Sequence, residues 1–327
     1  TGCAYSFKTS PDDEGFNDKM YFRNGKHFSM GGWQVVTINC PRAAYRAEGD
    51  DDKLFEELKK QIDLAIEIFR VKKQWMDKIV KAGRMPFATQ RPKDPYTGEK
   101  GDVAVYLDEL VYIVGVVGIN EMVQYHYGKQ MHEDRGALRL AVRAMTEMEL
   151  YVKELTEREG FEISFSRTPA ETVAQRFAVA DLLNKEFREK AMTVVKGDLP
   201  RALELMGKTR DLPIYYTNGT HVPPNADIPL AKRISIEHIF FPIVDGGDIM
   251  HIFLGEGYPD WRGIKSLAMK IATKTQTGYF AFTKDMTVCM DCSHVTMGLK
   301  EECENCHSRN LDYISRITGY LQSVSGW

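Results

Sequence analysis

Four cysteines near the end of the chain constrain its structure more than any other feature of the sequence. They form two C-x2-C pairs, Cys289 with Cys292 and Cys303 with Cys306, and ten residues separate the pairs. Each pair can bring two sulfurs to one metal ion through a tight turn, and two pairs complete a tetrahedral Zn²⁺ site. Because four thiolates fill the coordination sphere, we expect a structural metal rather than a catalytic one. Two disulfides or buried free thiols are the alternatives.

The composition shows no strong charge bias. The 327 residues carry a net charge of -3 and are 43% hydrophobic, which suits one large or two medium domains. This balance argues against a nucleic-acid binder driven by bulk charge, and no apolar run approaches the roughly 18 residues that span a membrane. The start lacks a signal peptide, and cysteines in metal spacing indicate a reducing compartment, so we expect a cytoplasmic protein.

Strand-like and helix-like segments alternate along the chain, which predicts an α/β fold. A β-branched run before Pro41 indicates a buried strand at 35–39, and residues 161–167 alternate like a second strand. Apolar residues at helical spacing predict amphipathic helices over 51–81 and 135–159. Further expected elements are a core helix within 102–121 with Gly115 and Gly118 at a packing contact, a hairpin over 236–254, a helix over 260–277 and a strand over 279–282.

The segment after the second strand has the features of an anion site. Thr168-Pro169-Ala170-Glu171 is a capping box with Pro at the first helical position. A strand that runs directly into a capped helix leaves backbone N–H groups and the positive end of the helix dipole for an anion. The segment is therefore either a well-made helix start or a seat for phosphates. Further on, His221 has no metal partner at ligand spacing, and we expect it to form a hydrogen bond.

Six features follow one another along the chain: Cys3 in TGCAYSF, VTIN-x-PR at 36–42, TPAE at 168–171, YYTN at 215–218, the C-x2-C pairs, and RITGY at 316–320. Their order and approximate spacing resemble those of class III (anaerobic) ribonucleotide reductases, and the resemblance covers nearly the whole chain. The chain departs from the family pattern where Ala4 replaces the usual Arg, Cys40 the usual Leu and Gly219 the usual Ser.

The resemblance implies the roles of the radical residues. Gly319 would carry a stable backbone radical, and Cys3 would carry the catalytic thiyl radical. The chemistry needs glycine, because a Cα without a side chain can become planar and spread the unpaired electron over the flanking amide groups. Cys40 is either a small buried hydrophobe or a second thiol. The residues expected at the substrate are Asn39, Thr168, Ala170, Glu171, Thr217 and Asn218.

The implied fold is the C-terminal part of a ten-stranded α/β barrel of the glycyl radical enzyme type, followed by a small four-cysteine zinc module and a radical loop. We expect the barrel portion, with the cysteine finger loop, over 1–283, the zinc module over 284–310 and the glycyl radical loop over 311–327. On this resemblance we expect the earlier strands and the nucleotide-specificity site of the family to lie outside this sequence. Because the chain starts at Thr1 without Met, we expect a fragment, from a split or spliced gene or a cloning truncation.

The implied activity is the anaerobic reduction of ribonucleoside triphosphates to 2′-deoxyribonucleoside triphosphates for DNA synthesis. A separate iron–sulfur enzyme that uses S-adenosylmethionine would generate the radical on Gly319. Tyr5 stands where thiol-using relatives can carry Glu, which favours formate as the reductant. The expected partners are this activating enzyme, the N-terminal part of the same reductase and a second copy in a homodimer.

Two other functions fit parts of the pattern. Another glycyl radical enzyme, such as a lyase or dehydratase, shares the cysteine-to-glycine logic but generally lacks paired C-x2-C motifs beside the glycine. A zinc-ribbon interaction module on an α/β scaffold would use Gly319 only as a turn residue.

Overall fold

The structure is a computed structural model that describes residues 22–23, 27–28, 32–89, 93, 96–99, 110–168, 172–247, 249–254, 259–316 and 321–323. At its centre is a parallel sheet of three strands in the order β3 (Gly32–Asn39), β4 (Val111–Val117) and β5 (Ile163–Arg167). Parallel neighbours require crossover connections, and here the crossovers are helical. The α/β class predicted from the sequence is confirmed.

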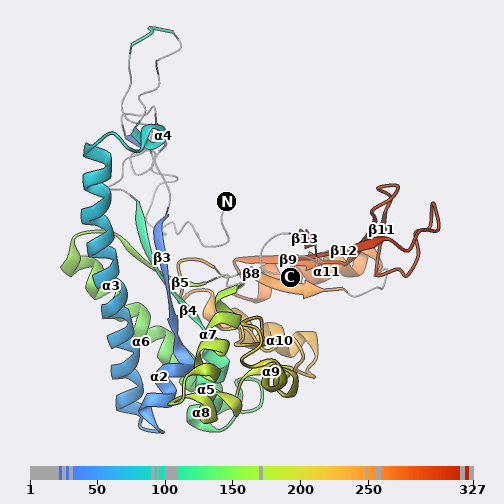
Figure 1. Cartoon of the computed structure of the whole chain (residues 1–327), viewed down its shortest axis with the longest axis horizontal. Coiled ribbons are helices and arrows are strands. Elements are labelled where there is room, and N and C mark those ends of the chain that lie inside the picture. The colour runs from blue at the N-terminus through green and yellow to red at the C-terminus, as the bar shows by residue number, and fades with distance from the viewer. Residues whose placement is uncertain are drawn as a thin grey trace.

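Helices α3 (Asp51–Lys81) and α6 (Arg135–Glu159) pack against one face of this sheet (Figure 1). Both match the predicted ranges, because each has an aspartate cap and an apolar stripe. Asp50 accepts a hydrogen bond from the Lys53 amide at the start of α3, and Gly160, at φ 69°, ends α6. The remaining crossover helices are α2 (Cys40–Ala47), α4 (Pro86–Thr89) and α5 (Ile119–Tyr127).

The main hydrophobic core lies between the sheet and these helices. Leu58 and Ile62 from α3 and Val114 from β4 are among its fully buried members. Burial of one such aliphatic side chain stabilises the fold by roughly 1.5–3 kcal/mol. The core therefore fixes the strand order, and with it the strand ends that carry the polar residues described below.

The core helix expected within 102–121 is wrong. Residues 111–117 form β4, the middle strand of the sheet, and α5 begins only at Ile119. A central parallel strand is buried on both faces, so its sequence is a continuous apolar run without alternation. Gly115 does lie at a close contact, since a Cβ there would lie 1.8 Å from the Thr168 Oγ1.

The chain after β5 builds the walls of a cavity. Its elements are α7 (Thr172–Leu183), α8 (Arg188–Met192), β6 (Lys196–Gly197), α9 (Leu199–Leu205), β7 (Ile214–Tyr215), α10 (Leu230–Glu237), the 3₁₀ helix η2 (His238–Phe240), β8 (Ile249–Phe253), α11 (Trp261–Lys274) and β9 (Tyr279–Thr283). The predicted helix over 260–277 and the strand over 279–282 are confirmed as α11 and β9.

The hairpin expected over 236–254 is wrong. Its first half is the end of α10 and the helix η2, and β8 pairs in parallel with β9. The Asp-Gly-Gly segment at its centre extends the main sheet instead of turning back. The Asp245 amide donates to the Phe165 carbonyl at 2.8 Å, and the Arg167 amide donates to the Gly246 carbonyl at 3.1 Å.

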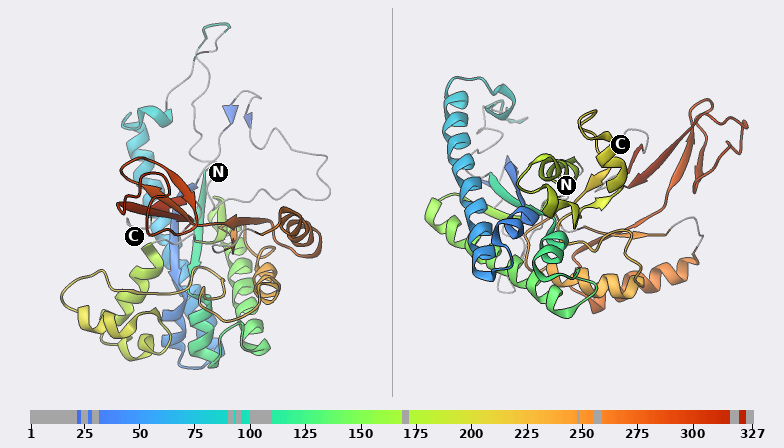
Figure 2. Two further views of the ribbon diagram at one scale, coloured as in Figure 1. Left: turned by 90° about the vertical axis from the view of Figure 1, so that its right-hand side faces the viewer. Right: turned by 60° about the horizontal axis from the view of Figure 1, so that its bottom comes forward.

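The last part of the chain is an antiparallel sheet in the order β11-β10-β12-β13, which projects away from α3 and α6 (Figure 2). Its strands are β10 (Met286–Cys289), β11 (Val295–Met297), β12 (Leu311–Arg316) and β13 (Leu321–Ser323). We call residues 284–323 the cysteine module and residues 32–283 the body. Arg316 pairs with Leu321, so residues 317–320 connect β12 to β13.

Two short strands, β1 (Phe22–Arg23) and β2 (His27–Phe28), form a separate antiparallel pair. They lie within a polar, glycine-rich stretch of the sequence, residues 11–32. Among the described residues, none of the helices combines the length and the apolar character that crossing a membrane requires.

Candidate functional site

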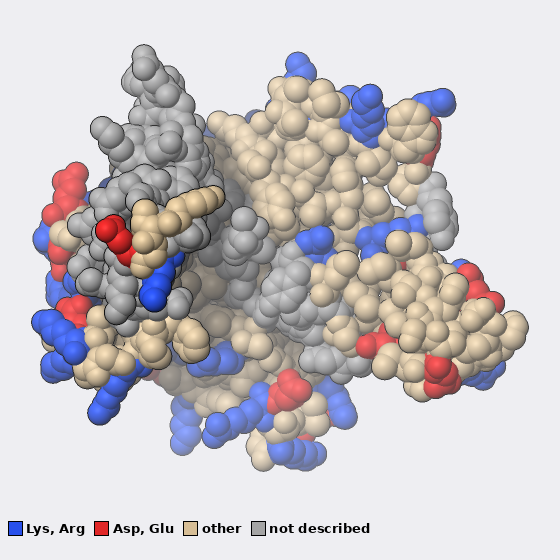
Figure 3. Space-filling view, turned by 90° about the horizontal axis from the view of Figure 1, so that it is seen from above, with Lys and Arg blue, Asp and Glu red and all other residues tan. Residues whose placement is uncertain are grey.

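A cavity of about 890 Å³ opens beside the carboxyl end of β5. The start of α7, the segment from β7 to Val222, the helix α10 and one face of β8 form its other walls. In open α/β sheets, ligands bind at the carboxyl ends of strands. Seen from above, charged side chains of both signs are spread over the periphery of the molecule rather than gathered into a field of one sign (Figure 3).

The segment 214–222 is the wall that carries the predicted YYTN motif, and buried groups hold it at several points. The Tyr216 hydroxyl donates to the Asp181 carboxylate at 2.9 Å and lies 2.9 Å from the Tyr45 hydroxyl. Asp181 also accepts hydrogen bonds from Asn39 Nδ2 and Arg42 Nε, each at 2.8 Å. Burial and the neighbouring Asp181 raise the pKa of Tyr216, so it remains a neutral donor.

Thr217 is held by a second buried carboxylate. Glu121 on α5 accepts from the Thr217 amide at 2.8 Å and from its hydroxyl at 2.7 Å. Lys196 Nζ lies 3.9 Å from the same carboxylate. Because the Gly118 amide also donates to the Thr217 carbonyl at 2.9 Å, the backbone that carries Asn218 into the cavity wall is fixed to the start of α5.

Arg167 at the end of β5 supports the next turn of the segment. Its side chain is fully buried and donates to the Thr220 hydroxyl at 2.9 Å. Gly219 lies against it at φ 46°, and a Cβ there would come within 2.8 Å of the Arg167 Cβ. Glycine at this position therefore leaves room for the Arg167 side chain.

His221 and Glu237 form a hydrogen-bonded contact at the cavity wall. The His221 Nδ1 lies 3.0 Å from Glu237 Oε2, and the Val222 amide donates to Oε1 at 3.0 Å. Burial alone would raise the pKa of Glu237, but His221, the Val222 amide and Arg167 outweigh it and hold the pKa below its ordinary value. The hydrogen bond predicted for His221 is confirmed.

The residues expected at the substrate fall into three groups. Thr168, Thr217 and Asn218 line the cavity. Asn39 is buried in the Asp181 network, where its Oδ1 accepts from the Arg42 amide at 3.3 Å, and it is not among the described residues that line the cavity. The rest, Ala170 and Glu171, lie outside the described residues, as do Cys3 and Gly319.

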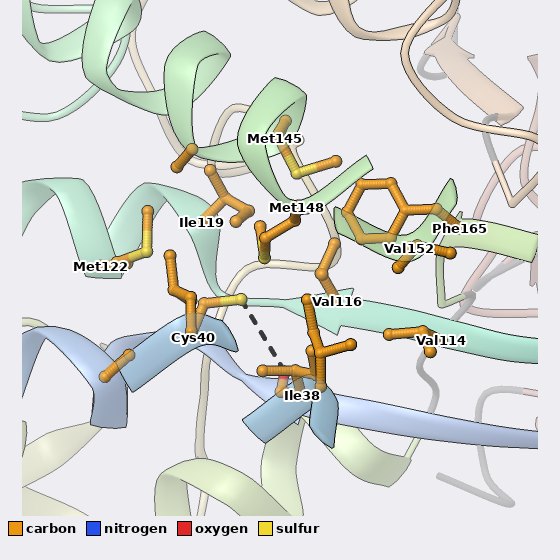
Figure 4. Close-up of a cluster of buried hydrophobic side chains, with 14 of the residues drawn as sticks. Ile38, Cys40, Val114, Val116, Ile119, Met122, Met145, Met148, Val152 and Phe165 are labelled. Carbon is orange, nitrogen blue, oxygen red and sulfur yellow. Dashed lines mark hydrogen bonds between the residues drawn. The ribbon is translucent and has the colours of Figure 1, made fainter. Parts of the chain in front are cut away.

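Cys40 lies in the main core, among Met122, Met145 and Met148 (Figure 4). Its thiol donates to the Ile38 carbonyl at 3.9 Å, and burial raises its pKa to about 12. A thiol with so little thiolate at neutral pH is a poor nucleophile. The placement matches the small buried hydrophobe of our two interpretations, and nothing in the geometry supports a second reactive thiol.

The four predicted cysteines come together in the cysteine module. Their sulfurs all lie within 4.8 Å of one another, with Cys289 Sγ 3.5 Å from Cys306 Sγ and Cys292 Sγ 3.6 Å from Cys303 Sγ. Disulfides would need about 2.05 Å. Tetrahedral Zn²⁺, with Zn–S distances of about 2.3 Å, places its sulfurs roughly 3.8 Å apart. The donor set fits a metal, and all four cysteines are free.

The two C-x2-C pairs share one backbone geometry. In each, the residue after the second cysteine has positive φ, 59° at Ser293 and 58° at His307. Each of these residues donates its amide to the carbonyl of the first cysteine of its pair, at 2.9 and 3.0 Å. Asn305 donates to Cys292 Sγ and lowers the pKa of that thiol to about 6, which favours the thiolate that a metal needs.

Comparison with known proteins identifies the family. The sequence profile of anaerobic ribonucleoside-triphosphate reductases matches residues 1–327. The chain belongs to this family. It is 24% identical to the reductase of Enterobacteria phage T4 over 310 residues, which is 88% of this chain and 44% of the relative. It is also 24% identical to the Escherichia coli reductase, over 97% of this chain and 43% of the relative.

Solved reductase structures share the fold. One anaerobic ribonucleotide reductase superposes with a TM-score of 0.70 at 22% identity, over 91% of this chain and 41% of that chain. The enzyme from Thermotoga maritima in complex with dATP and CTP superposes with a TM-score of 0.67 at 21% identity, over 91% of this chain and 44% of that one. The chain thus spans less than half the length of the relatives it matches.

The sequence did not point to the buried charged residues Asp181, Glu121, Arg167 and Glu237, which hold the cavity wall. Three of them lie on the helices α5, α7 and α10, and only the fold turns these particular side chains inward. Arg167 had a weak signal, since it ends an alternating strand directly before the capping box.

Proposed function

We propose that this chain is the later catalytic portion of an anaerobic reductase that converts ribonucleoside triphosphates into 2′-deoxyribonucleoside triphosphates. The observation that carries the proposal is the family match along all residues, 1–327. The cavity supports the proposal, because Thr168, Thr217 and Asn218 from two predicted motifs line the same cavity. The proposal also includes the fold: residues 1–283 form the later portion of the ten-stranded α/β barrel of this family.

The proposed chemistry uses two residues from opposite ends of the sequence. An activating enzyme with an iron–sulfur cluster and S-adenosylmethionine removes a hydrogen atom from the Gly319 Cα. The Gly319 radical then takes the hydrogen of the Cys3 S–H, and the thiyl radical removes the ribose 3′-hydrogen. The C2′ hydroxyl takes up a proton and leaves as water, formate is oxidised to CO₂ and supplies the two electrons and the hydrogen that replace the C2′–O bond by C2′–H, and Cys3 returns a hydrogen atom to C3′.

In this proposal the cysteine module has a structural role. Cys289, Cys292, Cys303 and Cys306 would hold Zn²⁺, which when bound cross-links the two turns. Cys289 on β10 pairs with Leu311 on β12, and β12 leads directly into residues 317–320. The predicted module at 284–310 and the start of the predicted loop at 311–327 thus share one sheet. A rigid β10–β12 pair would fix the position from which Gly319 approaches Cys3.

The direct test is product formation by the full-length enzyme. Activated anaerobically and supplied with CTP and formate, it should form dCTP, detected by mass spectrometry. Cys3→Ala should abolish the product while leaving Gly319 activation intact. A wild-type enzyme that carries the radical but reduces no ribonucleotide would favour another glycyl radical reaction.

A further inference from the structure

The partial exposure of His221 in the cavity wall is not explained by a role in holding its own loop. Its side chain is one-fifth exposed, at 20%, while the Glu237 side chain is buried, at 3%. The loop around it is already held without the imidazole, because Val222 is bonded to Glu237 and Thr220 to Arg167. The ring therefore has a role beyond fixing the backbone.

The contact with Glu237 fixes which ring nitrogen carries a proton. Since the pKa of Glu237 lies below its ordinary value, the carboxylate is ionised at neutral pH and can only accept. The His221 Nδ1 must then be the donor in the 3.0 Å contact. Among the described residues Nε2 has no hydrogen-bond partner, and it is the nitrogen left for a cavity ligand.

The charges around His221 favour an anionic ligand. Arg233 on α10 and Arg167 on β5 line the same cavity, and His251 on β8 lines its far wall. The Glu237 carboxylate is already engaged by His221, the Val222 amide and Arg233, which lies 3.5 Å away. Asp211, the other acid among the described residues that line the cavity, accepts from Gln175 at 2.7 Å. Both acids of this lining therefore already accept hydrogen bonds.

We propose that His221, oriented by Glu237, contacts a phosphate oxygen of the bound nucleoside triphosphate through a protonated Nε2. The proposal rests on the reductase function proposed above and adds a positioning residue to its substrate site. Binding of a phosphate and protonation of the imidazole favour each other, since each brings the opposite charge to the other. The phosphate and the Glu237 carboxylate together supply the negative charge that offsets Arg167 and Arg233.

The test compares two ligands across pH in the full-length enzyme, with dATP at saturating concentration. Dissociation constants for CTP and for cytidine, which lacks phosphates, are measured by calorimetry at pH 6.5 and 8.0. His221→Gln should weaken CTP binding about tenfold at pH 6.5 and much less at pH 8.0, because a neutral imidazole that donates from Nδ1 to Glu237 has no proton on Nε2 for the phosphate. Cytidine binding should not change. The ratio of variant to wild type removes the titration of CTP itself.

Two further variants separate orientation from folding. Glu237→Gln keeps an acceptor for the Val222 amide but removes the charge, so tight CTP binding should end at a lower pH than in the wild type. His238→Gln, the same substitution on η2 outside the lining of the cavity, should match the wild type.

Equal weakening of CTP and cytidine by His221→Gln, or a CTP ratio independent of pH, would overturn the assignment of His221 and leave the reductase function standing. Failure of the wild type to bind either ligand at this cavity would overturn both proposals.

Discussion

The body and the cysteine module reach a defined structure by different means. The body buries three apolar clusters, and its polar cavity wall is fixed by the buried carboxylates of Asp181, Glu121 and Glu237. In the module, the buried side chains of the described residues are only Thr287, Cys289 and Cys303, whereas Met290, Val295, Met297 and Leu299 are exposed. A sheet this small cannot build a sufficient hydrophobic core, so we expect the metal-binding cysteines to stabilise the module instead.

The difference explains where each region tolerates change. Carboxylates held by several donors keep the cavity wall rigid within an already stable body, and a lost hydrogen bond there leaves a buried charge without its partner. In the module, the loss of one metal ligand removes the main cross-link. We therefore expect a single substitution to unfold the whole module, whereas substitutions in the body should lower its stability step by step.

The largest effect should follow removal of the metal. A chelator, or Cys289→Ser, should remove Zn²⁺ and the order of β10–β12, because binding of a structural zinc contributes on the order of 10 kcal/mol to folding. Hydrogen exchange measured by mass spectrometry should show lost protection in 286–316 and unchanged protection in 51–81. Loss of protection in both ranges would mean that the two regions do not fold independently.

A smaller effect should follow Asp181→Ala in the body. The substitution leaves Asn39, Arg42 and Tyr216 without their shared acceptor, and it should lower the free energy of unfolding by about 3–5 kcal/mol. Urea unfolding measures this change, with Asp227→Ala as the exposed control, expected within about 0.5 kcal/mol. Equal effects of the two substitutions would contradict the role assigned to the network.

Acid should weaken the body through Glu237. The folded pKa of this carboxyl lies below its unfolded value of 4.5, so its contribution to stability is complete above that pH and is lost as the pH falls through the folded value. The stability difference between wild type and Glu237→Gln should therefore shrink from pH 6 to pH 3.5. A difference that stays constant over this range would show that the carboxylate is not ionised in the fold.

The smallest effect should come from Cys40→Ala. Removing one buried sulfur from the core should cost roughly 1 kcal/mol, and the reductase activity of the full-length enzyme should not change. Thermal unfolding and dCTP formation are the two measurements. Loss of activity in a variant that unfolds at the wild-type temperature would restore the second-thiol interpretation.

The sequence predicted elements whose periodicity comes from one buried face. Helices α3 and α6 each have one apolar stripe and an aspartate cap, so their boundaries could be predicted. Strand β4 could not, because burial on both faces removes the alternation that distinguishes a strand from a core helix. The prediction for 236–254 failed for another reason, since its Asp-Gly-Gly segment does not turn between two strands but hydrogen-bonds to distant β5 through an isolated bridge.

The candidate site divides in the same way. The cysteine cluster follows from local spacing, because each C-x2-C turn is complete within a few residues. Asn39 lies in a predicted motif, yet its contacts come from Arg42 and from Asp181, which is 142 positions away in the sequence. Contacts of that range depend on packing of the whole body, and no local pattern encodes them.

Anaerobic electron paramagnetic resonance of the full-length enzyme, mixed with its activating enzyme and S-adenosylmethionine, tests the central claim most directly. We predict a glycyl doublet in the wild type that is absent in Gly319→Ala, with the cysteine module metal-loaded in both samples. A folded, metal-loaded and activase-bound wild type without that signal would contradict the radical mechanism and favour a module whose role is interaction.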